Sequence, residues 1–160
     1  MKQLPEQIEA FLKGHRIAVA GVSRKGDVAA NAVLKKLLRS GYEAIPINPN
    51  ADTLEGVACY PTVNAIPGIV DGVVVATHPD VSADIVRQCA QAGVELVWFH
   101  RSFGQGSVSD EALAECKRVD IDPIVGGCPL MFADPVDPFH KIARWWLQKK
   151  GTVPSCKEVN

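Results

Sequence analysis

The sequence lacks a long apolar run and a strong net charge. No stretch approaches the ~18 consecutive apolar residues of a membrane span, and the N-terminal run Met1–Glu6 is polar where a signal peptide is cationic and then apolar. The net charge is −1, whereas nucleic-acid-binding domains usually carry a basic stripe. We therefore expect neither a membrane nor a nucleic acid as partner.

The sequence also lacks a cysteine pattern for disulfides or zinc. It has five cysteines, an odd number, and no C-x-x-C pair. Reduced thiols of a cytoplasmic protein fit this usage better than a disulfide framework or a zinc ribbon. With 160 residues, 47% of them hydrophobic, the chain has the length and apolar content of one globular domain. We place this single domain at residues 1–150 and a polar, frayed tail at residues 151–160.

Short apolar runs alternate with helical patterns, and this alternation predicts the fold class. The runs are apolar almost throughout, which is typical of strands buried on both faces of a parallel sheet. Five main strands are expected at residues 17–20, 44–47, 73–76, 96–99 and 123–125. Strand–helix–strand alternation then predicts an α/β fold with an open, doubly wound, mainly parallel sheet. The weaker run at residues 56–60 is expected as one extra edge strand, followed by a short helix at residues 62–66.

Apolar residues at helical spacing predict the helices that flank this sheet. The stripes at residues 30–38 and 81–90 are each followed by a helix-ending glycine. A further helix is expected to begin near Ser107, whose hydroxyl would cap it in a pair with Asp110. An N-terminal helix is expected at residues 5–12, packed on the outside of the sheet.

A C-terminal helix is expected at residues 138–149, with Asp137 as its N-cap and Pro138 at its first position. Its apolar stripe is expected to pack on the domain. The stripe consists of Phe139, Ile142, Ala143, Trp146 and Leu147. Trp145 falls off this stripe, and we expect it to cover a loop or to lie in a homodimer surface.

The first strand is followed by a loop suited to a phosphate group. In an open parallel sheet, ligands bind beyond the carboxyl ends of the strands. The loop reads Gly21-Val22-Ser23-Arg24-Lys25-Gly26-Asp27 and leads into a helix, whose N-terminus offers N–H groups and partial positive charge. Glycine permits close backbone approach, and the serine and the two basic residues add donors. We favour phosphate binding over an ordinary turn with solvated basic residues.

Two common nucleotide fingerprints fail at their diagnostic positions. A nicotinamide dinucleotide site calls for G-x-G-x-x-G and for an acidic residue at the end of the second strand. Here Ser23 stands at the second glycine, and that strand ends Asn48-Pro49-Asn50. A Walker loop needs Lys-Ser/Thr after the second glycine, where the chain has Asp27-Val28.

Several motifs in order along the chain carry a family resemblance. They are Gly21-Val22-Ser23, Gly41-Tyr42, Ile47-Asn48-Pro49, Gly56-Val57-Ala58-Cys59-Tyr60-Pro61, His78-Pro79, Trp98 and Gly127-Cys128-Pro129. Together they resemble the stand-alone CoA-binding domain proteins, which are similar to the N-terminal CoA-binding domain of the succinyl-CoA synthetase alpha subunit. The resemblance covers residues 10–150 and implies a Rossmann-like fold that binds coenzyme A through its phosphates and adenosine. The catalytic phosphohistidine of the ligase lies in a second domain, so the resemblance implies binding without catalysis.

The same resemblance assigns the binding residues by position. They are Gly21, Ser23 and Lys25 at the pyrophosphate, with Val22 and Arg24 in the same loop, Asn48 and Pro49 at the adenosine, and Thr77, His78 and Pro79 along the pantetheine. A further hypothesis places Cys128 near the thiol of coenzyme A, where an exposed thiolate would form a mixed disulfide. The alternative, which we favour, is a small apolar side chain packed under the turn at Pro129.

Three residues beyond strand ends raise the question of a metal or a nucleophile. His78, His100 and Cys128 would provide zinc ligands or a cysteine with a histidine base. Nothing in the sequence supplies a fourth ligand or an orienting acid, so we expect neither a metal site nor catalytic residues. The chain is therefore predicted to bind coenzyme A or an acyl-CoA as a non-catalytic domain. An NAD(P)-dependent oxidoreductase and an interaction scaffold without a ligand are the alternatives.

Overall fold

A five-stranded parallel sheet forms the centre of the computed structural model, which describes residues 2–3, 5–101, 105–151 and 157–158. Its strands, in spatial order, are β3 (Glu43–Ile47), β2 (Arg16–Ala20), β6 (Gly72–Val75), β7 (Val97–Phe99) and β8 (Ile124–Val125). The chain starts in β2, adds β3 on one side and then continues on the other side with β6, β7 and β8. This order confirms the predicted doubly wound α/β fold and puts the topological switch point between β2 and β6.

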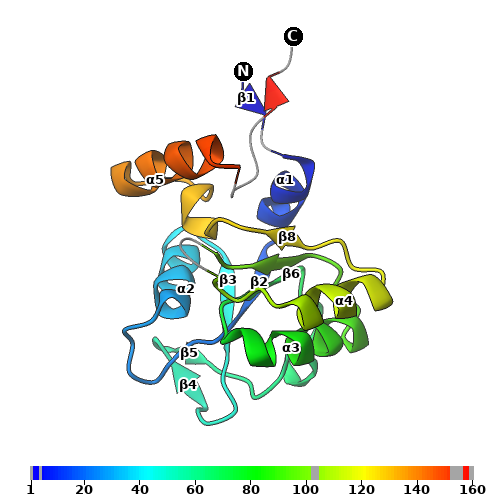
Figure 1. The fold of residues 1–160 in the computed structure, drawn as a ribbon. Coiled ribbons are helices and arrows are strands. Elements are labelled where there is room, and N and C mark those ends of the chain that lie inside the picture. Colours follow the sequence, from blue (N-terminus) through cyan, green and yellow to red (C-terminus); the bar gives the residue numbers. More distant parts are fainter. Residues whose placement is uncertain (1, 4, 102–104, 152–156, 159–160) are drawn as a thin grey trace.

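Helices cover both faces of the sheet (Figure 1). The strand residues alternate between two cores, because successive side chains of a strand point to opposite faces. Ile17 and Val19 pack with α1 (Glu6–Lys13) and α2 (Ala29–Arg39), and the same core contains residues of α5 (Pro138–Lys149). Ala18 and Ala20 pack with α3 (Pro79–Gln91) and α4 (Asp110–Arg118).

The largest buried side chain is an anchor of the first core. Trp98 of β7 is fully buried and donates its indole N–H to the carbonyl of Gly126 at 3.1 Å. The rings of Phe11 and Phe132 lie 5.3 and 5.7 Å from it, which are distances typical of favourable aromatic pairs. These contacts attach α1 and the turn η2 (Pro129–Met131) to the middle of the sheet.

Most of the predicted helix ends are confirmed, with one correction. Asp137 accepts the His140 N–H at 3.0 Å and caps α5, with Pro138 following it. The predicted cap of α4 is wrong by two residues, because Ser109, not Ser107, accepts the N–H of Ala112 at 3.1 Å. Ser107 is instead buried, and its N–H donates to the His100 carbonyl.

The predicted extra edge strand is instead part of a small hairpin. Strands β4 (Thr53–Leu54) and β5 (Val57–Ala58) pair antiparallel, joined by two residues with positive φ, Glu55 and Gly56. Two such residues fit the tight turns of two-residue hairpins. Only Tyr60 reaches the main sheet, through a parallel bridge to Ile47. The short helix that follows is confirmed as η1 (Val63–Ala65).

Three residues of the predicted α5 stripe do not pack on the domain. Ala143 and Leu147 are buried as expected, but Phe139, Ile142 and Trp146 are 65%, 66% and 43% exposed. The helix therefore touches the domain along a narrower strip than its apolar pattern suggests.

The two ends of the chain come together outside the main sheet. Strand β1 (Lys2–Gln3) pairs antiparallel with β9 (Lys157–Glu158), so the prediction of a frayed tail is wrong for these two C-terminal residues. Residues 152–156 and 159–160, which that prediction also covered, lie outside the described residues. Among the described helices, none is long and apolar enough to span a bilayer.

Candidate functional site

A cavity of about 510 Å³ lies at the switch point, beyond the carboxyl ends of β2, β3 and β6. This volume is within the range of about 300–1,000 Å³ of small-molecule sites. The loop after β2 contributes Gly21–Ser23, the loop after β3 contributes Asn48 and Pro49, and the loop after β6 contributes Thr77. Six predicted site residues from three separate strands are thus brought together around one hollow.

The opposite wall of the cavity consists of residues that were not predicted as site residues. They are Pro61 and Thr62 before η1, and Val81, Asp84, Ile85 and Gln88 on α3. Val81 is 48% exposed although it belongs to the predicted core stripe of this helix. The sequence signal that could have grouped the α3 residues is their spacing, since residues 81, 84, 85 and 88 follow the i, i+3, i+4, i+7 pattern of one helix face.

Gly21 is required by the packing of the backbone. Its φ is +99°, and a Cβ at this position would lie 2.3 Å from the carbonyl oxygen of Ala76. The loop after β2 therefore presses directly on the end of β6, which no side chain would permit. Gly21 itself lines the cavity, so this close approach lies at the cavity wall.

Asn31 of α2 holds the same loop and was missed at the sequence level. It is 1% exposed. Its Oδ1 accepts the Ser23 N–H at 2.8 Å, and its Nδ2 donates to the Ser23 carbonyl at 2.9 Å and to Glu55 Oε1 at 2.8 Å. The bond from Asn31 is the main cause that lowers the pKa of the Glu55 carboxyl, and Lys35, at 3.3 Å, acts in the same direction. One amide thus connects the loop, α2 and the β4–β5 hairpin.

Asn48 attaches the loop to β3 in a similar way. Its Nδ2 donates to the Val22 carbonyl at 2.8 Å, and its Oδ1 accepts the Asn50 N–H at 2.8 Å. Asn48 thus lines the cavity, but its side chain makes these hydrogen bonds to the protein backbone. Pro49, next to it, is exposed and faces the cavity.

The basic part of the loop lies at the surface. Arg24 and Lys25 are exposed, and the Lys25 N–H donates to Ser23 Oγ at 3.1 Å. No side chain caps the following helix at Val28, and its first turn has no acidic residue. The other described α-helices have an acidic residue in the first turn or a side-chain cap. The N-terminal end of α2 therefore keeps the partial positive charge that favours an anion.

The residues after β6 divide between the cavity and the start of α3. Thr77 lines the cavity, and its hydroxyl lies 3.0 Å from that of Ser82. His78 is exposed and caps α3, since its Nδ1 accepts the Asp80 N–H at 3.4 Å. Pro79 is the first residue of that helix. His78 and Pro79 are not among the described residues that line the cavity.

The structure does not assemble the three predicted metal or nucleophile candidates. Cys128 is 2% exposed in the first core, and burial raises the pKa of its thiol to about 12. Burial, with His140 nearby, lowers the pKa of His100. His78 caps α3 on the surface. Within the described part of the chain, no group of three potential metal ligands comes together.

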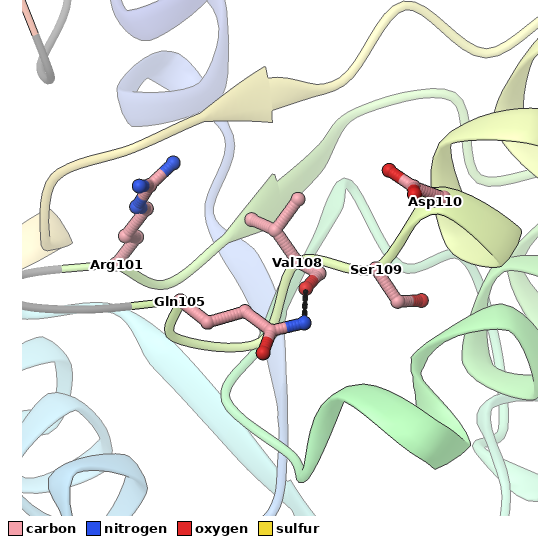
Figure 2. A pocket seen from close by; sticks show the side chains of 5 residues that line it. All are labelled: Arg101, Gln105, Val108, Ser109 and Asp110. Atoms are coloured by element: carbon pink, nitrogen blue, oxygen red, sulfur yellow. Dashed lines mark hydrogen bonds between the residues drawn. The ribbon is translucent and has the colours of Figure 1, made fainter.

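A second hollow, of about 380 Å³, lies where the chain enters α4 (Figure 2). Arg101, Gln105, Val108, Ser109 and Asp110 line it. Two of its polar side chains already serve the protein, since Gln105 Nε2 donates to the Val108 carbonyl at 2.9 Å and Ser109 caps the helix. The acidic first turn of α4 makes this hollow unsuited to phosphate.

Comparison with known proteins shows what this chain is similar to and which family it belongs to. YneT of Bacillus subtilis is 30% identical over 110 residues, which are 69% of this chain and 78% of YneT. An ADP-forming acetate–CoA ligase of Archaeoglobus fulgidus is 31% identical over 81 residues, which are 49% of this chain and only 12% of the ligase. The solved structure of a hypothetical protein from Pyrococcus horikoshii superposes with a TM-score of 0.70 at 30% identity, covering 78% of this chain and 85% of that one. The CoA binding domain family matches residues 15–134, and the chain therefore belongs to this family.

Proposed function

We propose that this chain binds coenzyme A or an acyl-CoA in the switch-point cavity and does not itself transform the bound thioester. The observation that carries the proposal is the loop from Gly21 to Ser23, which forms a wall of a cavity at the carboxyl edge of the sheet. Family membership supports coenzyme A as the ligand. So does the similarity to an enzyme whose name includes CoA, the ligase of Archaeoglobus fulgidus.

The phosphate groups would meet side-chain donors. The Ser23 N–H is already bonded to Asn31, so it is not the donor for the pyrophosphate. The Ser23 hydroxyl accepts from Lys25 and keeps its own proton to donate. The charged groups of Arg24 and Lys25 and the uncapped start of α2 supply positive charge.

The less polar parts of the ligand would lie across the α3 wall. Val81 and Ile85 give this wall an apolar surface, and Ile47, at the end of β3, and the exposed ring of Pro49 add further apolar surface to the cavity. Pantetheine and adenine have apolar surface that such side chains cover favourably. Thr77 lies on the same side as α3 and is the neutral polar group nearest the end of β6.

The residues that line the cavity also support the proposal that the site is non-catalytic. None of the described residues that line the cavity is a cysteine or a histidine. Cys128 lies in the core with the pKa of its thiol raised to about 12, and a thiol, unlike a thiolate, is a poor nucleophile. The cavity thus presents binding groups without an activated nucleophile.

Calorimetry with coenzyme A, acetyl-CoA, NAD and NADP at one salt concentration tests the proposal. Coenzyme A and acetyl-CoA should bind with similar affinity, because the recognised phosphates are the same in both. The double variant Arg24→Ala/Lys25→Ala should bind about tenfold more weakly, which corresponds to ~1.4 kcal/mol. Tight NAD binding without any heat from coenzyme A would refute the proposal.

A matched control removes a charge from the opposite edge of the sheet. Lys117 is exposed in the last turn of α4, and Lys117→Ala should leave the affinity unchanged. The non-catalytic clause is tested separately by incubating the protein with acetyl-CoA and measuring free thiol. Thiol release above that of buffer alone would show that the protein cleaves the thioester.

A further inference from the structure

Helix α5 has an apolar face that points away from the domain. Phe139, Ile142, Trp145 and Trp146 are 65%, 66%, 56% and 43% exposed. At 3.6 residues per turn these positions span about a third of the helix circumference, centred about 110° from Ala143 and Leu147, which are buried. Figure 1 shows α5 at the margin of the molecule. We call these four residues the α5 face.

Contacts on the inner side fix the rotation of the helix. Arg144 donates from Nη1 to the Met131 carbonyl at 2.9 Å, and its guanidinium lies 5.5 Å from the centre of the Phe132 ring. The helix is also capped by Asp137. The α5 face is therefore held outward by the same packing that holds the helix to η2.

The exposed area is large for a single helix. Covering an aromatic side chain buries about 150–250 Å², so the exposed fractions of the three aromatic residues correspond to about 250–400 Å² before Ile142 is added. Apolar patches of about 300–600 Å² are the largest on typical monomers and often mark interaction sites. Such a patch is about half of the ~800 Å² that each partner of a standard interface buries.

Charge is distributed unevenly along the helix. Asp137 caps its N-terminal end, with Asp134 three residues earlier, and Lys149 and Lys150 lie at its C-terminal end. Lys141 is a further exposed cation one turn after Asp137. The two lysines lie over the rings of Trp145 and Trp146, with ammonium groups 4.2 and 3.7 Å from the ring centres. A second α5 laid antiparallel would bring each acidic end to the other copy's basic end.

We propose that the α5 face is a homodimer surface, on which α5 of a second copy packs antiparallel about a two-fold axis near Ile142. A two-fold axis brings the same surface of both copies together, so the acidic end of each helix would meet the basic end of the other. The family match ends at residue 134, before α5 begins. The dimer surface therefore lies outside the matched domain, and its test is independent of ligand binding.

Sedimentation velocity of the full chain between about 5 and 200 μM tests the proposal. The wild type should sediment as a dimer in the upper part of this range. Ile142→Glu and Trp145→Glu should each raise the dimer dissociation constant at least tenfold, because a carboxylate would be buried in the interface. Both side chains are exposed in the single chain, so circular dichroism should show unchanged folding. The matched control is Ile69→Glu, since Ile69 is 81% exposed on a loop far from α5 in sequence.

Charge reversal tests the antiparallel arrangement. Lys149→Glu/Lys150→Glu should weaken the dimer, and adding Asp134→Lys should restore part of its affinity. A wild type that stays monomeric throughout the range would refute the proposal, as would a control that dissociates as readily as Trp145→Glu. Co-sedimentation of a monomeric chain with phosphatidylserine vesicles, abolished by Trp145→Glu, would identify a membrane surface as the occupant and overturn the dimer. No loss of affinity in the charge-reversed variant would overturn the antiparallel arrangement.

Discussion

Replacing Asn31 by alanine removes the side chain that holds the candidate phosphate loop. Asn31 is buried and makes hydrogen bonds of 2.8, 2.9 and 2.8 Å to the Ser23 N–H, the Ser23 carbonyl and Glu55. Alanine keeps the helix intact, since it is the residue with the highest helix propensity. The effect of Asn31→Ala therefore reports the hydrogen bonds and the cavity that the amide leaves.

The expected loss of stability is about 2–4 kcal/mol. Each neutral hydrogen bond contributes about 0.5–1.5 kcal/mol net, and a bond to a charged group about 1.5–3 kcal/mol. The sum is reduced where water enters at the half-buried Ser23 and replaces a lost bond. Domains of this size have stabilities of about 5–15 kcal/mol, so the variant should remain folded and testable.

Urea unfolding followed by circular dichroism measures the loss, and calorimetry with coenzyme A measures the consequence for the loop. Asn64→Ala is the matched control: its amide donates to Gln91 Oε1 at 3.2 Å on the surface, and such changes are usually within about 0.5 kcal/mol. Coenzyme A should bind Asn31→Ala more weakly than it binds Asn64→Ala, because the displaced loop is no longer preorganised. Equal stability of the two variants would refute the reasoning.

Three further predictions concern the backbone and the buried titratable groups. Gly21→Ala should lower the stability by more than ~2 kcal/mol, because positive φ disfavours alanine and the added Cβ would lie 2.3 Å from the Ala76 carbonyl oxygen. A urea midpoint equal to that of the wild type would contradict this prediction. Because burial lowers the pKa of His100 in the folded state, the unfolded chain takes up the proton first, and stability should fall as the pH drops below about 6.5, the ordinary histidine pKa. His100→Gln should flatten that dependence between pH 7.5 and 5.5, and an unchanged slope would contradict the assignment. Burial raises the thiol pKa of Cys89 and Cys128 to about 12. Peptide mapping after treatment with iodoacetamide at pH 8 should therefore find both cysteines unmodified in the native protein and modified in urea. Rapid labelling of the native protein would contradict their burial.

The sheet was predictable because its strands are buried on both faces and carry an unmistakable apolar pattern. The run at residues 73–75 has the short, wholly apolar pattern of a buried strand, and it lies in β6 at the centre of the sheet. The N-cap of α4 was harder to predict, because Ser107 and Ser109 both precede an acidic turn. The backbone hydrogen bond from Ser107 to the His100 carbonyl, a contact outside the helix, leaves Ser109 as the cap. The α5 pattern specified a helix but not which apolar residues would face the domain.

The candidate site was predictable where function depends on local sequence and unpredictable where it depends on distant contacts. Gly21 could be named from the loop after the first strand, and Asn48 from the family resemblance. Asn31 could not, because its role depends on Glu55, which is brought to it by the β4–β5 hairpin. The hairpin itself was predicted as an edge strand, so its contact with α2 was not foreseen.

Two asparagine amides, rather than charged groups, hold the loop at residues 21–23 in its shape, and this affects how the proposed site would recognise phosphate. Asn31 binds both backbone groups of Ser23, and Asn48 binds the Val22 carbonyl. With the Ser23 N–H already used, phosphate recognition at the proposed site would depend on the exposed side chains of Arg24 and Lys25 together with the uncapped start of α2. Interactions between exposed charges are strongly screened by salt, so the affinity for coenzyme A should fall as salt rises and should do so less in Arg24→Ala/Lys25→Ala. In the proposed site, a chain of net charge −1 would thus bind a highly charged ligand largely through two cations on a loop whose geometry neutral groups maintain.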